Sequence, residues 1–230
     1  MEAGRPADPP TVAEDEAAPL HGEADDIWGA SGSLRIWRDF ADIVVTVDIA
    51  AEERRDAGDF KDMANRVVLA DITEVLWSRH DFGVERVTLA NHAWLDDQRL
   101  VLGDSAWLEV GHQYLVALFR TIDGQDWGEL GTDATFPLAN GRVAPVDDPG
   151  LLAQELRGLR PGQIADRLHA FRPDPTIERY ADYPPFIRRE LVLAESGENP
   201  NADEPGAEPV YEDPDPPTPD DYPTTTVTPR

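Results

Sequence analysis

The sequence contains no cysteine among its 230 residues, which excludes a disulfide framework and any metal site built on thiolates. It has no run of 18 apolar residues, which excludes a membrane-spanning helix. Residues 1–10 lack the basic and apolar stretches of a secretory signal, and no compartment follows from the sequence. Basic residues are scarce, because 20 Lys and Arg face 46 Asp and Glu for a net charge of −26. This acidic field repels phosphates, so we expect neither a nucleic-acid partner nor membrane insertion.

Acidic residues and proline concentrate at the two ends of the chain. Residues 1–26 carry eight acids and one base, and residues 195–230 carry ten acids and one base, which leaves −10 for the middle. Neither end has enough large apolar side chains to offset the entropy lost on ordering. We therefore predict a disordered acidic segment at 1–33, folded parts at 34–146 and 147–194, and a disordered Pro-rich acidic tail at 195–230.

Strand signals fill the middle of the chain. Apolar residues alternate from Ile43 to Ile49, which predicts a strand with one buried face. The stretch 66–77 is apolar on both faces and its spacing also suits a helix. Its β-branched residues favour a strand.

Further strands are expected beyond these two. Short strands are predicted at 86–90 and 127–130. Asn140-Gly141 is a strong signal for a two-residue turn, and it predicts a hairpin between 136–138 and 142–143. The middle is therefore a meander of roughly five to seven strands.

The stretch from His112 to Ile122 is apolar on both faces, so both faces of this strand must be covered. Gly111 permits a bend at its start. One face carries Tyr114, Val116 and Leu118, and the other carries Leu115, Ala117 and Phe119.

Helical spacing replaces the strand pattern after residue 149. One short helix is predicted at 151–159, a second begins at Pro161, and a third begins at Pro185. Their expected inner residues are Ile164, Leu168, Phe171, Ile187 and Leu191. The predicted fold is mainly β with C-terminal helices: a small antiparallel OB-like barrel with a short helical cap and disordered acidic tails.

Four stretches together resemble the OB-like barrel of poorly characterised, often exported bacterial proteins. They are 41–45, 72–77, 110–119 and 136–143, and Gly111-x-x-Tyr114-Leu115 is the most specific part. More distantly, the chain is similar to the netrin-like domain of tissue inhibitors of metalloproteinases. The resemblance implies an exported barrel whose core includes residues of 114–119. Those inhibitors chelate zinc through an N-terminal cysteine, and because this chain has none, their mechanism is not carried over.

Two pieces of a serine esterase pattern occur in the sequence. Gly103-Asp104-Ser105 with Asp166-x-x-His169 supplies a nucleophile, a base and carboxylates. That family needs an alternating α/β chain, whereas Ser105 falls between strands. A hydrolase using Ser105 and His169 is therefore kept as an alternative, and His169 is expected to be a half-buried packing residue.

Imidazole and carboxylate groups occur at His80-Asp81, His92 and Asp96-Asp97. These groups suit zinc or manganese, but none has the compact repeat spacing of a known site, so they are interpreted as polar turns. The sequence has no Gly-rich phosphate loop. No metal and no cofactor are therefore expected.

Tryptophan offers the remaining binding surface. Six tryptophans occur, at positions 28, 37, 77, 94, 107 and 127. Trp77 and Trp107 are expected to fill the mouth of the barrel, and Trp94, beside the acidic pair Asp96-Asp97, is expected to be the most exposed.

These observations favour a non-enzymatic binding or accessory module for an unknown protein partner. Its expected binding loops are 78–85, 91–106 and 123–127. The candidate binding residues are Trp94, Asp96, Asp97 and Trp127. Carbohydrate binding through exposed tryptophan is a further alternative.

Overall fold

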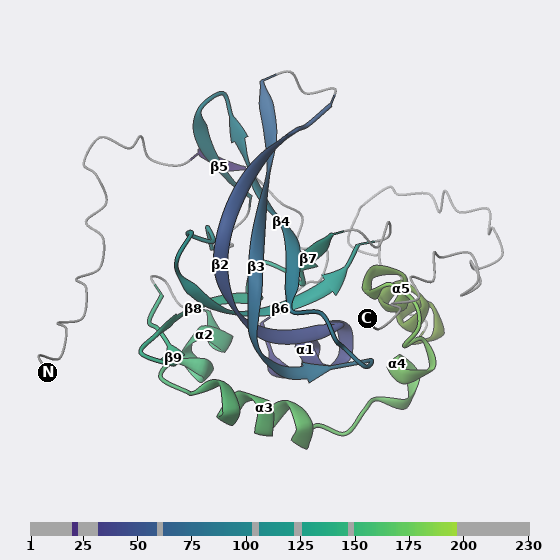
Figure 1. Ribbon diagram of the computed structural model, residues 1–230. Helices are drawn as coiled ribbons and strands as arrows, with labels where there is room; N and C mark the ends of the chain where they lie inside the picture. The colour runs from purple at the N-terminus through teal and green to yellow at the C-terminus, as the bar shows by residue number, and fades with distance from the viewer. Residues whose placement is uncertain are drawn as a thin grey trace, which may run out of the picture.

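The computed structural model describes residues 20–22, 32–58, 62–102, 106–121, 126–146 and 150–196 (Figure 1). The strands are β1 (Leu20–Gly22), β2 (Ile43–Asp56), β3 (Met63–Ser78), β4 (Arg86–Leu95), β5 (Gln98–Leu102), β6 (Gln113–Arg120), β7 (Trp127–Glu129), β8 (Thr135–Ala139) and β9 (Arg142–Val143). The helices are α1 (Leu34–Phe40), α2 (Leu151–Leu156), α3 (Pro161–Ala170), α4 (Pro175–Arg179) and α5 (Pro185–Ser196). The molecule is mainly β with C-terminal helices, as predicted.

The strands form a closed barrel. Their order in the sheet is β1-β5-β4-β3-β2-β6-β8-β9. The sheet closes because β7 pairs in parallel with β4 and antiparallel with β6. The barrel therefore consists of β2, β3, β4, β7 and β6, which confirms the predicted OB-like architecture.

The two longest strands, β2 and β3, curl around the barrel and continue beyond it. Their pairing shifts register at three places, Val44/Val45, Thr46/Val47 and Ile49/Ala51. Such bulges bend a strand and raise its twist, which a small closed barrel requires. The ends of β2 and β3 away from the helices, together with the β4–β5 hairpin, form a projection that we call the distal arm (Figure 1).

The barrel has two apolar cores, one inside it and one beneath the helices. Ile43, Val45, Val47 and Ile49 lie inside the barrel. Val44 on the opposite face of β2 belongs to the second core, which contains residues of α1, α2 and α3. The prediction that one face of this strand is exposed was therefore wrong, because helices cover it.

Several local predictions are confirmed. β3 is a strand, and β6 places Tyr114, Val116 and Leu118 inside the barrel. The opposite face of β6 places Leu115 and Ala117 in the helix-covered core. The bend before β6 occurs at Gly111, whose φ of 83° lies in the left-handed region that glycine tolerates.

The predicted β8–β9 hairpin is present as well. Asn140 and Gly141 form its turn with φ of 53° and 68°, the positive values that this tight turn requires. A sequence with Asn-Gly at this point therefore encodes the turn directly.

The helices were predicted less completely. α3 begins with Pro161 and buries Ile164 and Leu168, as expected. On α5, however, Ile187 and Leu191 are half-buried, and the fully buried side chain is Arg188. α1 and α4 were not predicted. Among the described residues, no helix is long and apolar enough to cross a bilayer.

A strand lies within the segment that was predicted to be disordered. Leu20–Gly22 forms β1 and pairs with β5. At the end of the same segment, Ser33 caps α1 by accepting a hydrogen bond from the Ile36 amide. The prediction for the tail after residue 196 falls outside the described residues.

Candidate functional site

The candidate binding residues do not form one site. Asp96 and Asp97 are exposed at the turn between β4 and β5, and Trp94 lies beside them on β4. Trp127 is 7% exposed in the barrel core, where its ring meets that of Phe82 edge-on at 5.6 Å. The predicted loop 91–106 is largely the β4–β5 hairpin, because both of its halves are strands. Trp127 is therefore a core residue.

Trp94 is half-buried, as is Trp107, whereas Trp37, Trp77 and Trp127 are buried. The guanidinium of Arg54 lies 4.0 Å from the centre of its ring and also pairs with Asp97 at 3.0 Å. The edge of Trp107 meets it at a centroid distance of 5.1 Å. A sugar could stack on Trp94 only after Arg54 moved away.

Trp107 is enclosed by cations and by an imidazole. His92 stacks on it at 5.5 Å, and the guanidinium groups of Arg66 and Arg99 lie 4.1 and 4.8 Å from its ring centre. His92 Nε2 is 3.0 Å from the carbonyl oxygen of Ala106, and burial lowers the pKa of this imidazole. Trp77 lies in the helix-covered core, and its predicted place in the barrel mouth was wrong.

A polar group, the Arg66 cluster (Arg66, Glu52, Asn91, Glu129), lies beneath this stack, with Arg66 and Asn91 buried and Glu52 exposed at its edge. Arg66 sits where β3 and β4 shift register between Asn65 and Val67, which turns its side chain inward to complete burial. Its guanidinium donates to Glu52, Asn91 and the carbonyl of Leu108. These bonds satisfy a charge that burial would otherwise penalise heavily.

Glu129 on β7 completes the Arg66 cluster. Asn91 Nδ2 donates to Glu129 Oε1 at 3.0 Å. Burial raises the pKa of Glu129 to about 7, against the opposing effects of the hydrogen bond from Asn91 and of the Arg66 charge. Sequence reasoning missed this group, although an acidic residue within the predicted strand 127–130 is an available signal.

The metal and hydrolase alternatives can be compared with the described residues. The described ranges contain no group of three or more His, Asp or Glu side chains placed to hold a metal ion. Ser105 lies outside the described residues, and His169 is exposed on α3, so its expected half-buried position was wrong.

The β5 edge of the sheet holds a segment that is distant in sequence. β5 pairs with β4 on one side, from Ala93↔Leu100 to Leu95↔Gln98. On its other side it pairs in parallel with β1, through Leu20↔Leu100, His21↔Val101 and Gly22↔Leu102. β5 contains no proline, and its printed register with β4 shows no shift, so its backbone can accept a further strand on this edge.

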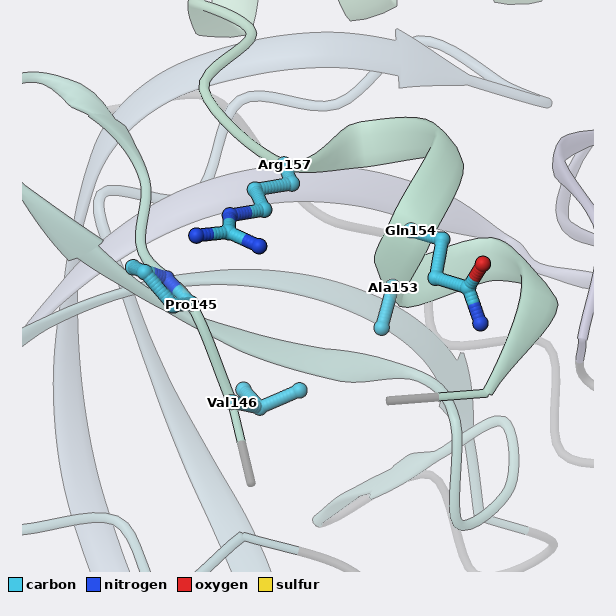
Figure 2. Close-up of a pocket in the computed structure, with 5 residues that line it drawn as sticks. All are labelled: Pro145, Val146, Ala153, Gln154 and Arg157. Atoms are coloured by element: carbon cyan, nitrogen blue, oxygen red, sulfur yellow. The ribbon is translucent and has the colours of Figure 1, made fainter. Parts of the chain in front are cut away.

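A small pocket lies at the other end of the molecule, between α2 and the segment that follows β9 (Figure 2). Its volume is about 240 Å³, and its lining residues are Pro145, Val146, Ala153, Gln154 and Arg157. This is below the usual size of small-molecule sites, about 300–1,000 Å³. No nucleophile or carboxylate lines it.

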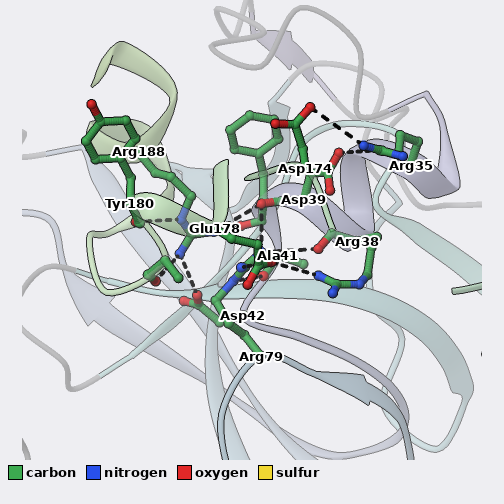
Figure 3. A network of polar contacts seen from close by, with 12 residues as sticks. Arg35, Arg38, Asp39, Ala41, Asp42, Arg79, Asp174, Glu178, Tyr180 and Arg188 are labelled. Atoms are coloured by element: carbon green, nitrogen blue, oxygen red, sulfur yellow. Dashed lines mark hydrogen bonds and ion pairs between the residues drawn. The ribbon is translucent and has the colours of Figure 1, made fainter. Parts of the chain in front are cut away.

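A second buried arginine network joins the last helix to the first (Figure 3). Arg188 donates to the carbonyls of Asp39, Phe40, Tyr180, Ala181 and Tyr183 and to Asp42 Oδ1, over 2.9–3.3 Å. Arg79 donates to the carbonyls of Arg38, Asp39 and Ala41 and to Glu178. Both side chains therefore cap α1, whose last carbonyls have no partner within the helix. This network attaches α5 to the C-terminal end of α1.

No protein-family model matches the chain, and no curated protein matches it either. The closed barrel is consistent with an OB-like fold. The relationship to netrin-like inhibitors stays a prediction.

Proposed function

We propose that the protein is a non-enzymatic binding module that takes up an extended segment of a partner protein as an added strand on the β5 edge. The parallel pairing of β1 with β5 carries this proposal, because it gives an example of an extended segment held on that edge. Strand addition of this kind is a recurring mode of peptide recognition, in which backbone hydrogen bonds supply affinity.

The shape of the edge supports the proposal. β5 has five residues, but its ladder with β4 ends at Leu100. Among the described strands, β1 alone pairs with Val101 and Leu102. An unoccupied edge would therefore present backbone donors and acceptors that need partners.

The surroundings of the edge favour a protein segment over a small molecule. Leu95, at the tip of the hairpin, is 37% exposed. Arg99 on β5 pairs with Glu109, and Arg54 on the distal arm pairs with Asp97. A partner side chain therefore meets apolar surface and ion pairs that can be exchanged.

The test uses the full chain with Leu20→Pro and His21→Pro together, because proline removes the amide hydrogens that a ladder needs. The probe is a fluorescein-labelled peptide with the sequence of residues 14–28, and the control peptide carries the same two prolines. We expect saturable binding of the first peptide, with slower hydrogen exchange at the amides of Gln98–Leu102. Absence of binding, or binding that leaves those amides unprotected, would refute the proposal.

A further inference from the structure

We infer that Leu20–Gly22 is an intramolecular competitor that keeps the β5 edge closed, and that the partner is an extended acidic segment running parallel to β5. This inference rests on the proposed function and adds its regulation and the chemistry of the partner.

The first observation is the small extent of β1. It makes three residue pairs, all with β5, and β5 is its only partner in the sheet as described. Short edge elements open with much lower free energy than a barrel core does. β1 can therefore leave β5 without disturbing the barrel.

The second observation is the short connection. Residues 23–33 separate the end of β1 from the start of α1, which is anchored in the helix-covered core through Leu34 and Trp37. A tether of this length gives β1 an effective concentration at the β5 edge that is roughly in the millimolar range. An external segment must compete with β1. Its apparent Kd therefore equals its Kd for the open edge divided by the fraction of chains whose edge is open.

The third observation concerns the end of β5, which pairs with β1. Val101 is 7% exposed and lies beyond the residues of β5 that pair with β4. Further along the chain, the carbonyls of Ala106 and Leu108 accept hydrogen bonds from the Arg66 cluster, and His92 contacts the Ala106 carbonyl. Release of β1 leaves the last two residues of β5 without a ladder among the described strands. A partner strand must restore the pairing that β1 provides, and so it runs in the same direction.

The sequence around β1 indicates the chemistry of the partner. Glu14, Asp15 and Glu16 precede β1, and Glu23, Asp25 and Asp26 follow it. Arg99 lies on β5, and Arg54 lies near it on the distal arm, where each already pairs with a carboxylate. The competitor that replaces β1 therefore has carboxylates on both sides of a short segment whose paired residues, like Leu20–Gly22, include no proline.

The experiment compares three full-length chains: the natural sequence, Leu20→Pro/His21→Pro, and the matched control Leu20→Ala/His21→Ala, which keeps both amide hydrogens. Fluorescence anisotropy measures the Kd of the labelled peptide 14–28 for each. We expect the proline variant to bind at least about tenfold more tightly than the natural chain, and the alanine control to resemble the natural chain.

The outcomes separate the two proposals. If no chain binds the peptide, the proposed function fails. If the natural chain binds as tightly as the proline variant, the function stands and the competitor is refuted. An alanine control that binds like the proline variant refutes closure by the backbone ladder.

The direction of the added strand is tested separately. A spin label at the peptide's N-terminus should broaden amide signals near the β4–β5 turn, and a label at its C-terminus should broaden those near Leu102. The reverse pattern would refute parallel addition.

Discussion

Replacing Leu118 with alanine tests the centre of the barrel. Its side chain is fully buried, and its strand is paired with Ile43 of β2 on one side and Glu129 of β7 on the other. The change removes three carbons, worth about 2.4 kcal/mol at about 0.8 kcal/mol each. Because hydrogen-bonded pairing fixes the strands on both sides of β6, they can move little to fill the cavity. We therefore expect a total loss of about 3–5 kcal/mol, in the upper part of the usual range.

Urea unfolding followed by circular dichroism measures this loss as a change in the free energy of unfolding. The matched control is His112→Ala, because His112 is exposed beside the bend at Gly111 and should change stability by no more than about 0.5 kcal/mol. A larger loss for His112→Ala than for Leu118→Ala would show that β6 is placed or oriented otherwise.

Three further predictions follow from the buried charges and from the ends of the chain. Because burial raises the folded pKa of Glu129 to about 7 from an ordinary 4.5, the folded state holds a proton that the unfolded state has lost between these pH values. This group therefore lowers stability as pH rises from about 4.5 to 7, by up to about 1.4 kcal/mol per pH unit, and urea titrations of Glu129→Gln across this range should lack that decline. Arg188→Met should cost about 3–5 kcal/mol, measured by the same unfolding, because Asp42 and several carbonyls lose a buried partner. Truncation to residues 27–196 should keep the fold and cost no more than about 1 kcal/mol, and a truncated chain without a cooperative thermal transition would contradict this.

The barrel could be predicted because the apolar residues that its strands bury occur at every second position, a pattern visible within each strand. The turn at Asn140-Gly141, the bend at Gly111 and the inner face of α3 all follow from residues close in sequence. The buried outer face of β2 could not be predicted, because it is covered by α1, which the sequence pattern does not predict, and by α2 and α3, about a hundred residues away. The same reason explains α5, where distant carbonyls make Arg188 an inner residue.

The candidate site was predicted less well than the fold. Trp94, Asp96 and Asp97 are neighbours in the sequence, but the guanidinium of Arg54 lies over the Trp94 ring, and no local pattern indicates the position of Arg54. Glu129 is part of a buried cluster because a bulge turns Arg66 inward, and bulges have no reliable sequence signal. β1 has only three residues, too few for any periodicity.

The contact between Arg188 and the end of α1 has a kinetic consequence. Its guanidinium bonds to the carbonyl of Asp39, 149 residues earlier, so it closes a loop that contains the whole barrel. A contact over such a separation is entropically costly to form before the intervening chain has folded. It therefore forms late, after the transition state, and weakening it should accelerate unfolding while leaving the refolding rate nearly unchanged. The last helix thus governs how long the folded molecule lasts more than how fast it forms.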